Sequence, residues 1–143
     1  MTRFAIILFL FLCSCFSINA QSIELDYDGK KTVVFENINV LPNHIVQTNT
    51  YFNSEYIEVV FKVTSLEIGK YELVFKPNFD DEIAMEGDYF CYVTSDIDDM
   101  MPFKEGFIEI TSSNNGLVSG SFQGKSPQGQ TFKGTFKDIK IEN

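Results

Sequence analysis

Hydrophobic and polar residues alternate along most of the chain after residue 20. At its start Ile23, Leu25 and Tyr27 alternate with acidic residues. A period of two places successive side chains on opposite faces of a β-strand, so such a segment is expected to bury one face and expose the other. No window of the chain after residue 20 keeps the three- and four-residue apolar spacing of an amphipathic helix. The pattern therefore predicts an all-β protein.

Turn-forming residues separate the apolar runs about every ten residues, the spacing typical of consecutive hairpins in sandwiches and barrels. We expect one antiparallel β-sandwich or flattened meander barrel of about eight or nine strands. The predicted strands are residues 23–28, 31–36, 44–48, 55–63, 71–75, 89–94, 106–111, 117–124 and 130–141.

The last two predicted strands carry alternating glycine and phenylalanine. The intervening Pro127-Gln128-Gly129 suits a three-residue hairpin loop, because proline fixes φ and glycine accepts a left-handed backbone. This loop sets a register in which each phenylalanine ring covers a glycine and fills the space that a side chain would take. The facing pairs are Gly124 with Phe132, Phe122 with Gly134, and Gly120 with Phe136.

The apolar positions then change parity, since Phe136 is followed by Ile139 and Ile141. One extra residue in a strand produces such a change, so we expect a β-bulge near Lys137-Asp138.

The first twenty residues have the features of an export signal. Arg3 precedes a short apolar run, and small and polar residues follow it up to Ala20. This order predicts cleavage after Ala20, and the run is shorter than the roughly 20 apolar residues that cross a bilayer. The sequence Leu-Cys-Ser-Cys at residues 12–15 offers an alternative, since it resembles a bacterial lipobox in which Cys15 would be acylated. We therefore expect a secreted, periplasmic or outer-envelope protein, tethered to a membrane only if Cys15 carries lipid.

Cleavage would leave residues 21–143 as a single domain with Cys91 as its only cysteine. An internal disulfide is then excluded, and stability must come from packing. Cys91 lies in an apolar run, and we interpret it as a buried core residue.

The formal net charge is −9, and the chain after Arg3 contains no arginine. Nucleic-acid binding depends on clustered basic residues, so this composition argues against it. No serine-hydrolase elbow, zinc-protease motif or Cys-x-x-Cys motif is present, and His44 is the only histidine. We therefore assign no catalytic residue from the sequence.

Two acidic segments lie on either side of the strand predicted at residues 89–94. Calcium prefers several carboxylate and carbonyl oxygens, although the spacing here is not that of an EF-hand. The alternatives are a weak calcium site and a solvated loop without a ligand. The candidate ligands are Asp80, Asp81, Asp96, Asp98 and Asp99.

Residues 100–103 combine Met100, Met101 and Phe103 beside these acids. Methionine side chains adapt to varied partners, so this segment is a candidate contact loop. The alternative is a flap that covers one end of the core.

Four motifs in the second half of the chain resemble a known group. They are Gly-Lys-Tyr-Glu-Leu from Gly69, Gly-Phe-Ile-Glu-Ile-Thr from Gly106, Ser-Gly-Ser-Phe from Ser119 and Phe-Lys-Gly-Thr-Phe from Phe132. This pattern resembles small exported or lipid-anchored β-domains of unknown function that are abundant in Bacteroidota. The resemblance implies the fold and the compartment, and it implies no catalytic residue.

We therefore expect a non-catalytic binding or interaction module, with a protein or a small apolar molecule as its partner. One alternative is a hydrolase of exterior polymers that uses two carboxylates, which requires a cleft that brings two acids together. The other is a passive structural component of the envelope.

Overall fold

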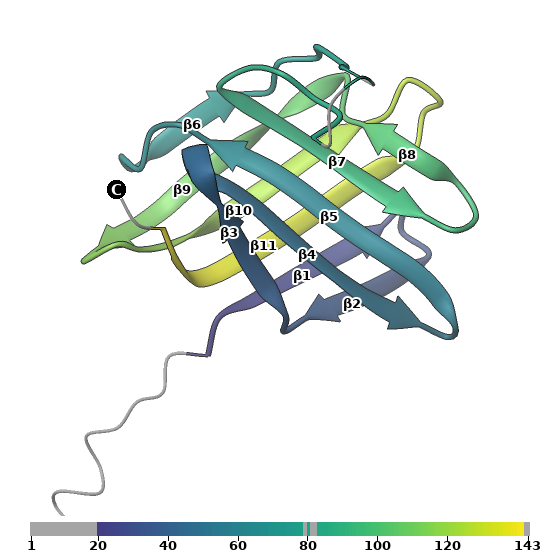
Figure 1. Cartoon of the computed structure of the whole chain (residues 1–143), viewed down its shortest axis with the longest axis horizontal. Coiled ribbons are helices and arrows are strands. Elements are labelled where there is room, and N and C mark those ends of the chain that lie inside the picture. Colours follow the sequence, from purple (N-terminus) through teal and green to yellow (C-terminus); the bar gives the residue numbers. More distant parts are fainter. Residues whose placement is uncertain (1–19, 79, 81–82, 142–143) are drawn as a thin grey trace, which may run out of the picture.

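The computed structural model describes residues 20–78, 80 and 83–141. Within these residues the chain forms eleven strands in two antiparallel sheets that face each other (Figure 1). Sheet A has the strand order β2-β1-β11-β10-β9-β6, and sheet B has the order β3-β4-β5-β7-β8. The elements are β1 (Ser22–Tyr27), β2 (Lys31–Phe35), β3 (Ile38–Leu41), the 3-10 turn η2 (Pro42–His44), β4 (Ile45–Phe52), β5 (Glu55–Val63), β6 (Gly69–Glu72), β7 (Tyr89–Ser95), β8 (Asp99–Pro102), β9 (Glu105–Asn114), β10 (Leu117–Lys125) and β11 (Thr131–Lys140).

The two sheets form a sandwich and do not close into a barrel. Strands β2 and β6 end sheet A, and β3 and β8 end sheet B, so each sheet has two edges in the part of the chain described. The all-β prediction is confirmed, and of its two architectures the flattened barrel is wrong.

Each of the nine predicted strands overlaps an observed one, and two further strands make the expected count too low. The bounds differ most for β6, which ends at Glu72 and not at residue 75, and for β4, which extends to Phe52 and not to residue 48. Strand β3 has four residues without a clear alternation of burial. Strand β8 contains Pro102 and begins at Asp99, whose φ of 53° is unusual for a strand. Both are edge strands, where proline and short length are tolerated because one side of the backbone needs no partner.

The predicted hairpin of β10 and β11 is confirmed in its register. Gly120 pairs with Phe136, Phe122 with Gly134, and Gly124 with Phe132. The loop has the expected chemistry, since Gly129 has a φ of 96° and its amide donates to the Ser126 carbonyl at 3.0 Å.

The rings of Phe122 and Phe136 cover Gly134 and Gly120 as expected. A Cβ on Gly134 would lie 2.1 Å from Cζ of Phe122, and one on Gly120 would lie 2.6 Å from Cζ of Phe136. The expectation for Gly124 is wrong, because the nearest ring is that of Phe103, whose Cδ2 would lie 2.2 Å from the added Cβ. Phe103 enters from the connection between β8 and β9, which a two-strand register cannot reveal.

The predicted bulge is confirmed near Asp138. Val118 pairs with Ile139 and Gly120 with Phe136, so two residues of β11 face one residue of β10. Asp138 has a φ of 51°, and its amide donates to Ser119 Oγ at 2.9 Å. The bulge turns Ile139 into the core with Phe136, so the change of parity keeps both side chains buried.

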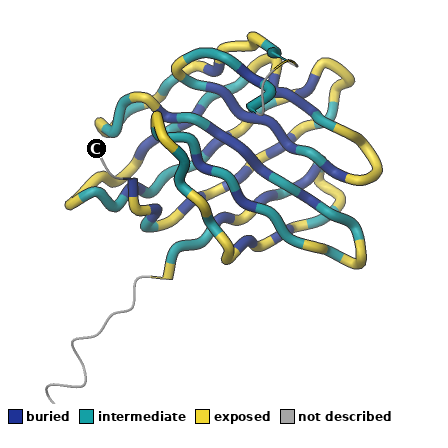
Figure 2. The backbone as a smooth tube through the Cα atoms, viewed as in Figure 1, coloured by how far each residue is buried: buried dark blue, intermediate teal, exposed yellow. Residues whose placement is uncertain are grey.

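The space between the sheets is filled by apolar side chains. Figure 2 shows buried positions along the middle of the strands and exposed positions at the turns. Aromatic rings dominate the centre, where Phe61 lies 5.4 Å from Phe122 and 5.1 Å from Phe136 between ring centroids. Cys91 is buried in the same core, and burial raises the pKa of its thiol well above the ordinary value. This thiol is packed as an apolar side chain, as the sequence indicated.

The predicted export segment lies outside the described residues, apart from Ala20, which is exposed. Cleavage after Ala20 and lipidation of Cys15 both stay predictions. Among the residues described, no helix is both long and apolar enough to cross a membrane.

Candidate functional site

The acidic residues of the β7–β8 turn serve as hydrogen-bond acceptors for the fold. Asp96 Oδ2 accepts the Tyr56 amide at 2.9 Å, and Asp98 Oδ2 accepts the Tyr27 hydroxyl at 2.5 Å. Asp99 begins β8, and Asp80 lies exposed on the connection between β6 and β7. Asp81 lies outside the described residues. No three Asp, Glu, His or Cys side chains in the described ranges are close enough to hold a metal ion, and calcium stays a prediction.

Tyr27 connects the two sheets at one end of the sandwich. Its side chain comes from β1, is 3% exposed, and has its hydroxyl 3.4 Å from Met101 Sδ in addition to the bond to Asp98. Lys31 Nζ lies 4.5 Å from the centre of the Tyr27 ring and forms an ion pair with Glu55. These contacts join β1 and β2 of sheet A to β5 and the β7–β8 turn of sheet B, so the cluster has a structural role.

Two buried tyrosines make the domain sensitive to alkaline pH. Burial, reinforced by the bond to Asp98, raises the pKa of Tyr27 far above its ordinary value. Burial and the negative charge of Glu58 raise the pKa of Tyr92 to about 12. An unfolded chain releases phenolic protons near pH ~10, whereas the native chain retains them. The stability that these groups supply is therefore complete below pH ~10 and is lost as the pH rises towards their folded pKa values.

We expect the urea midpoint of unfolding to fall steadily between pH 9 and 11.5, a range that brackets the unfolded tyrosine pKa of about 10. The variant Tyr92→Phe should lose part of this slope, while Thr135→Ala, an exposed change in β11, should keep it. If the urea midpoint of Tyr92→Phe fell with pH as steeply as that of the parent protein, the role assigned to Tyr92 would be contradicted.

The predicted contact loop is a strand whose side chains divide between two faces. Met101 and Phe103 are 1% and 0% exposed in the core between the sheets, so they are not presented to a partner. Met100 points to the opposite face of sheet B, where it packs against a second apolar cluster. Met101 and Phe103 therefore fit the alternative given above, a segment that packs against the core.

His44 is held at the end of η2. Its Nδ1 lies 3.2 Å from the Val63 carbonyl oxygen, which accepts the hydrogen bond, and its φ of 58° belongs to the tight turn. The residue therefore fixes the start of β4 against the end of β5.

A second apolar cluster lies on the outer face of sheet B, outside the sandwich core. It consists of Val60, Met85, Phe90 and Tyr92, with Ile45, Ile83 and Met100 packed beside it. Strands β5 and β7 contribute to both clusters because their consecutive residues are apolar, as in Tyr89-Phe90-Cys91-Tyr92-Val93. Such a continuous run is typical of a strand that is covered on both faces.

The cover over this outer face is formed by the described residues of the connection from β6 to β7, residues 73–78, 80 and 83–88, which we call the arm. It folds back on itself, since the Asn78 amide donates to the Ala84 carbonyl at 2.9 Å and the Glu86 amide to the Lys76 carbonyl at 2.8 Å. Met85 forms an antiparallel bridge with Pro77. This pairing places the side chains of Ile83 and Met85 against β5 and β7.

Between the arm and sheet B lies an open hollow of about 510 Å³, which we call the sheet B hollow. Its volume falls within the range of about 300–1,000 Å³ typical of ligand sites. Four apolar side chains and two charged ones surround it: Ile45, Ile83, Met85 and Phe90, with Lys62 and Glu86.

A smaller hollow of about 290 Å³ lies on the outer face of sheet A. Glu24 and Asp26 line it together with Lys133, so two carboxylates share one depression, as the hydrolase hypothesis requires. Asp26 is engaged in the turn after β1, where its Oδ1 accepts the Gly29 amide at 2.8 Å.

No protein-family model, curated protein or solved structure matches this chain. The resemblance to exported β-domains of Bacteroidota stays a prediction.

Proposed function

We propose that this protein is an exported, non-catalytic binding module that holds an apolar group in the sheet B hollow. The observation that supports this proposal is the open hollow outside the core, where the partly buried Ile45 and Ile83 lie beside a floor formed by the buried Phe90 and Met85. Apolar surface left open to water costs free energy, about 25 cal/mol per Å², and a ligand that covers it recovers that energy.

The location differs from the contact loop that the sequence suggested, and it lies outside the sandwich core. A ligand inside the sandwich would have to displace the packed rings of Phe61, Phe122 and Phe136. The segment of Met101 and Phe103 is committed to the same core. The outer face of sheet B offers apolar contact without disturbing either.

A binding role also agrees with the state of the reactive side chains. The Cys91 thiol is buried, the Nδ1 of His44 faces a backbone carbonyl, and Asp98 accepts the Tyr27 hydroxyl. Each is used for packing or for a turn, and none of them lines the sheet B hollow.

Titration with the neutral apolar dye Nile red tests the proposal. The parent protein should raise the dye's fluorescence with saturable binding. Ile83→Glu places a charge at the apolar wall, and we expect it to weaken binding at least about tenfold, equivalent to about 1.4 kcal/mol. Ile45→Glu, on the opposite wall, should have the same effect.

Ile97→Glu provides the matched control, because Ile97 is 72% exposed in the β7–β8 turn. It should bind Nile red as the parent does, and far-UV circular dichroism should show that all variants are folded. Saturable binding that is unchanged in both hollow variants would place the ligand elsewhere, and absence of binding by the parent would reject the proposal.

A further inference from the structure

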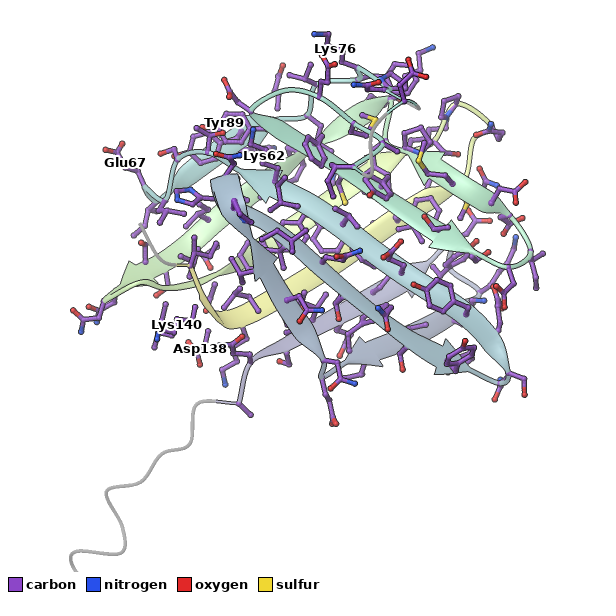
Figure 3. The ribbon with its side chains drawn as sticks, viewed as in Figure 1. Lys62, Glu67, Lys76, Tyr89, Asp138 and Lys140 are labelled. Atoms are coloured by element: carbon purple, nitrogen blue, oxygen red, sulfur yellow. The ribbon has the colours of Figure 1, made fainter. Side chains whose placement is uncertain are left out.

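One cation, Lys62, stands at the rim of the sheet B hollow. It comes from the outer face of β5, where it pairs with Phe90 near the start of β7 (Figure 3). Its Nζ donates one hydrogen bond, of 2.9 Å, to the Gly87 carbonyl of the arm. An ammonium group has three donors, so two more hydrogen bonds are open to a ligand.

The acidic residues nearest to this rim already have partners. Glu86 forms an ion pair with Lys76 and accepts the Asn78 amide at 2.8 Å. Glu58, on the same face of β5, accepts the Gln47 amide at 2.7 Å. In the described part of the chain, no carboxylate lies within ion-pair distance of Lys62.

A half-buried cation without a counter-ion is therefore positioned beside an apolar surface, in a chain with a net charge of −9. A neutral apolar ligand would leave this ammonium beside apolar contacts, which costs solvation energy. A ligand with an anionic end would supply the missing charge and two hydrogen-bond acceptors.

We propose that the ligand is a free single-chain amphiphile with a carboxylate head, such as a medium-chain fatty acid. Its carboxylate pairs with Lys62, and its hydrocarbon chain lies along Ile45 and Ile83, over the floor formed by Met85 and Phe90. This inference rests on the proposed function, since it names the ligand class of the same hollow.

The charge distribution favours a free amphiphile over a bilayer surface. Anionic membranes attract clusters of several basic residues, each worth about 1 kcal/mol. Among the described residues, Lys62 is the only basic residue that lines the hollow, and the nearby Lys76 is already paired with Glu86.

Calorimetric titration with decanoate and with decanol tests this assignment, because the two differ only at the head group. The parent protein should bind decanoate roughly five- to tenfold more tightly than decanol, as expected for one charge-assisted contact. Lys62→Met keeps an apolar side chain and removes the charge, so it should bind the two equally. Lys70→Met, which removes a cation from the other sheet, should keep the preference.

The other possible results distinguish an error in the ligand assignment from an error in the proposed function. Equal affinities in the parent, with Nile red still bound, would overturn the carboxylate assignment and leave the binding function intact. Loss of both decyl ligands and of Nile red would reject the function as well. Sedimentation of the parent, but not of Lys62→Met, with phosphatidylglycerol vesicles would overturn the free-amphiphile assignment in favour of a membrane surface.

Discussion

Replacing Gly134 by alanine should destabilise the domain by about 2 kcal/mol, although alanine is normally the better strand residue. Removing glycine gains about 0.5–1 kcal/mol of backbone entropy, whereas overpacking a core costs about 1–3 kcal/mol or more. The new Cβ would lie 2.1 Å from Cζ of Phe122. That ring is buried and is confined by Phe61 and Phe103 at 5.4 and 6.4 Å between centroids, so it has no space to move. The free energy of unfolding, measured in urea, provides the test.

A double-mutant cycle shows whether the ring causes the effect. In a Phe122→Leu background the clash is absent, and Gly134→Ala should cost less than about 1 kcal/mol. Gly120→Ala is the matched control, because its Cβ would lie 2.0 Å from the Glu109 carbonyl oxygen as well as 2.6 Å from the Phe136 ring. Shortening Phe136 to leucine cannot relieve a backbone clash. Equal costs of Gly134→Ala in the two backgrounds would contradict the explanation.

Deleting residues 138–143 should abolish cooperative folding. The deletion removes Ile139 and Ile141, which are 0% and 2% exposed, and burial of each is worth about 1.5–3 kcal/mol. It also removes the Ile141 amide that donates to the Gly116 carbonyl at 2.8 Å and the pairing of Ile139 with Val118. Together these losses approach the total stability of a small domain, about 5–15 kcal/mol.

Differential scanning calorimetry measures this loss directly. The full-length variant Lys137→Ala, altered at an exposed position just before the deletion, should retain the thermal transition of the parent. A truncated protein that unfolds with the parental Tm and enthalpy would show that the end of β11 contributes little to the core.

The parts of the fold that could be predicted from the sequence are those fixed by neighbouring residues. The register of β10 and β11 depends on a loop of three residues, and the bulge near Asp138 follows from one change of parity. In both cases the residues that indicate the feature lie within twenty residues of the feature itself. Strand β8 was not predicted, because Pro102 and the left-handed Asp99 are typical of a loop. Only its pairing with β7 makes this segment a strand.

The candidate site could not be predicted in this way, because its parts come from separate stretches of the chain. Lys62 and Gly87 are 25 residues apart and meet only after the arm has folded over sheet B. A signal for this outer layer was nevertheless present. The run Tyr89-Phe90-Cys91-Tyr92-Val93 lacks alternation, and a strand without a polar face requires cover on both sides.

The arm divides the walls of the hollow into a fixed half and a variable half. Ile45 and Phe90 belong to strands of the sandwich, whereas Ile83 and Met85 belong to a segment held largely by its own backbone pairing. Substitutions in the second group alter the shape of the hollow without touching the packing between the sheets. A scaffold of this kind can acquire a new ligand preference by changing one connection, in nature or by design, while its stability is preserved.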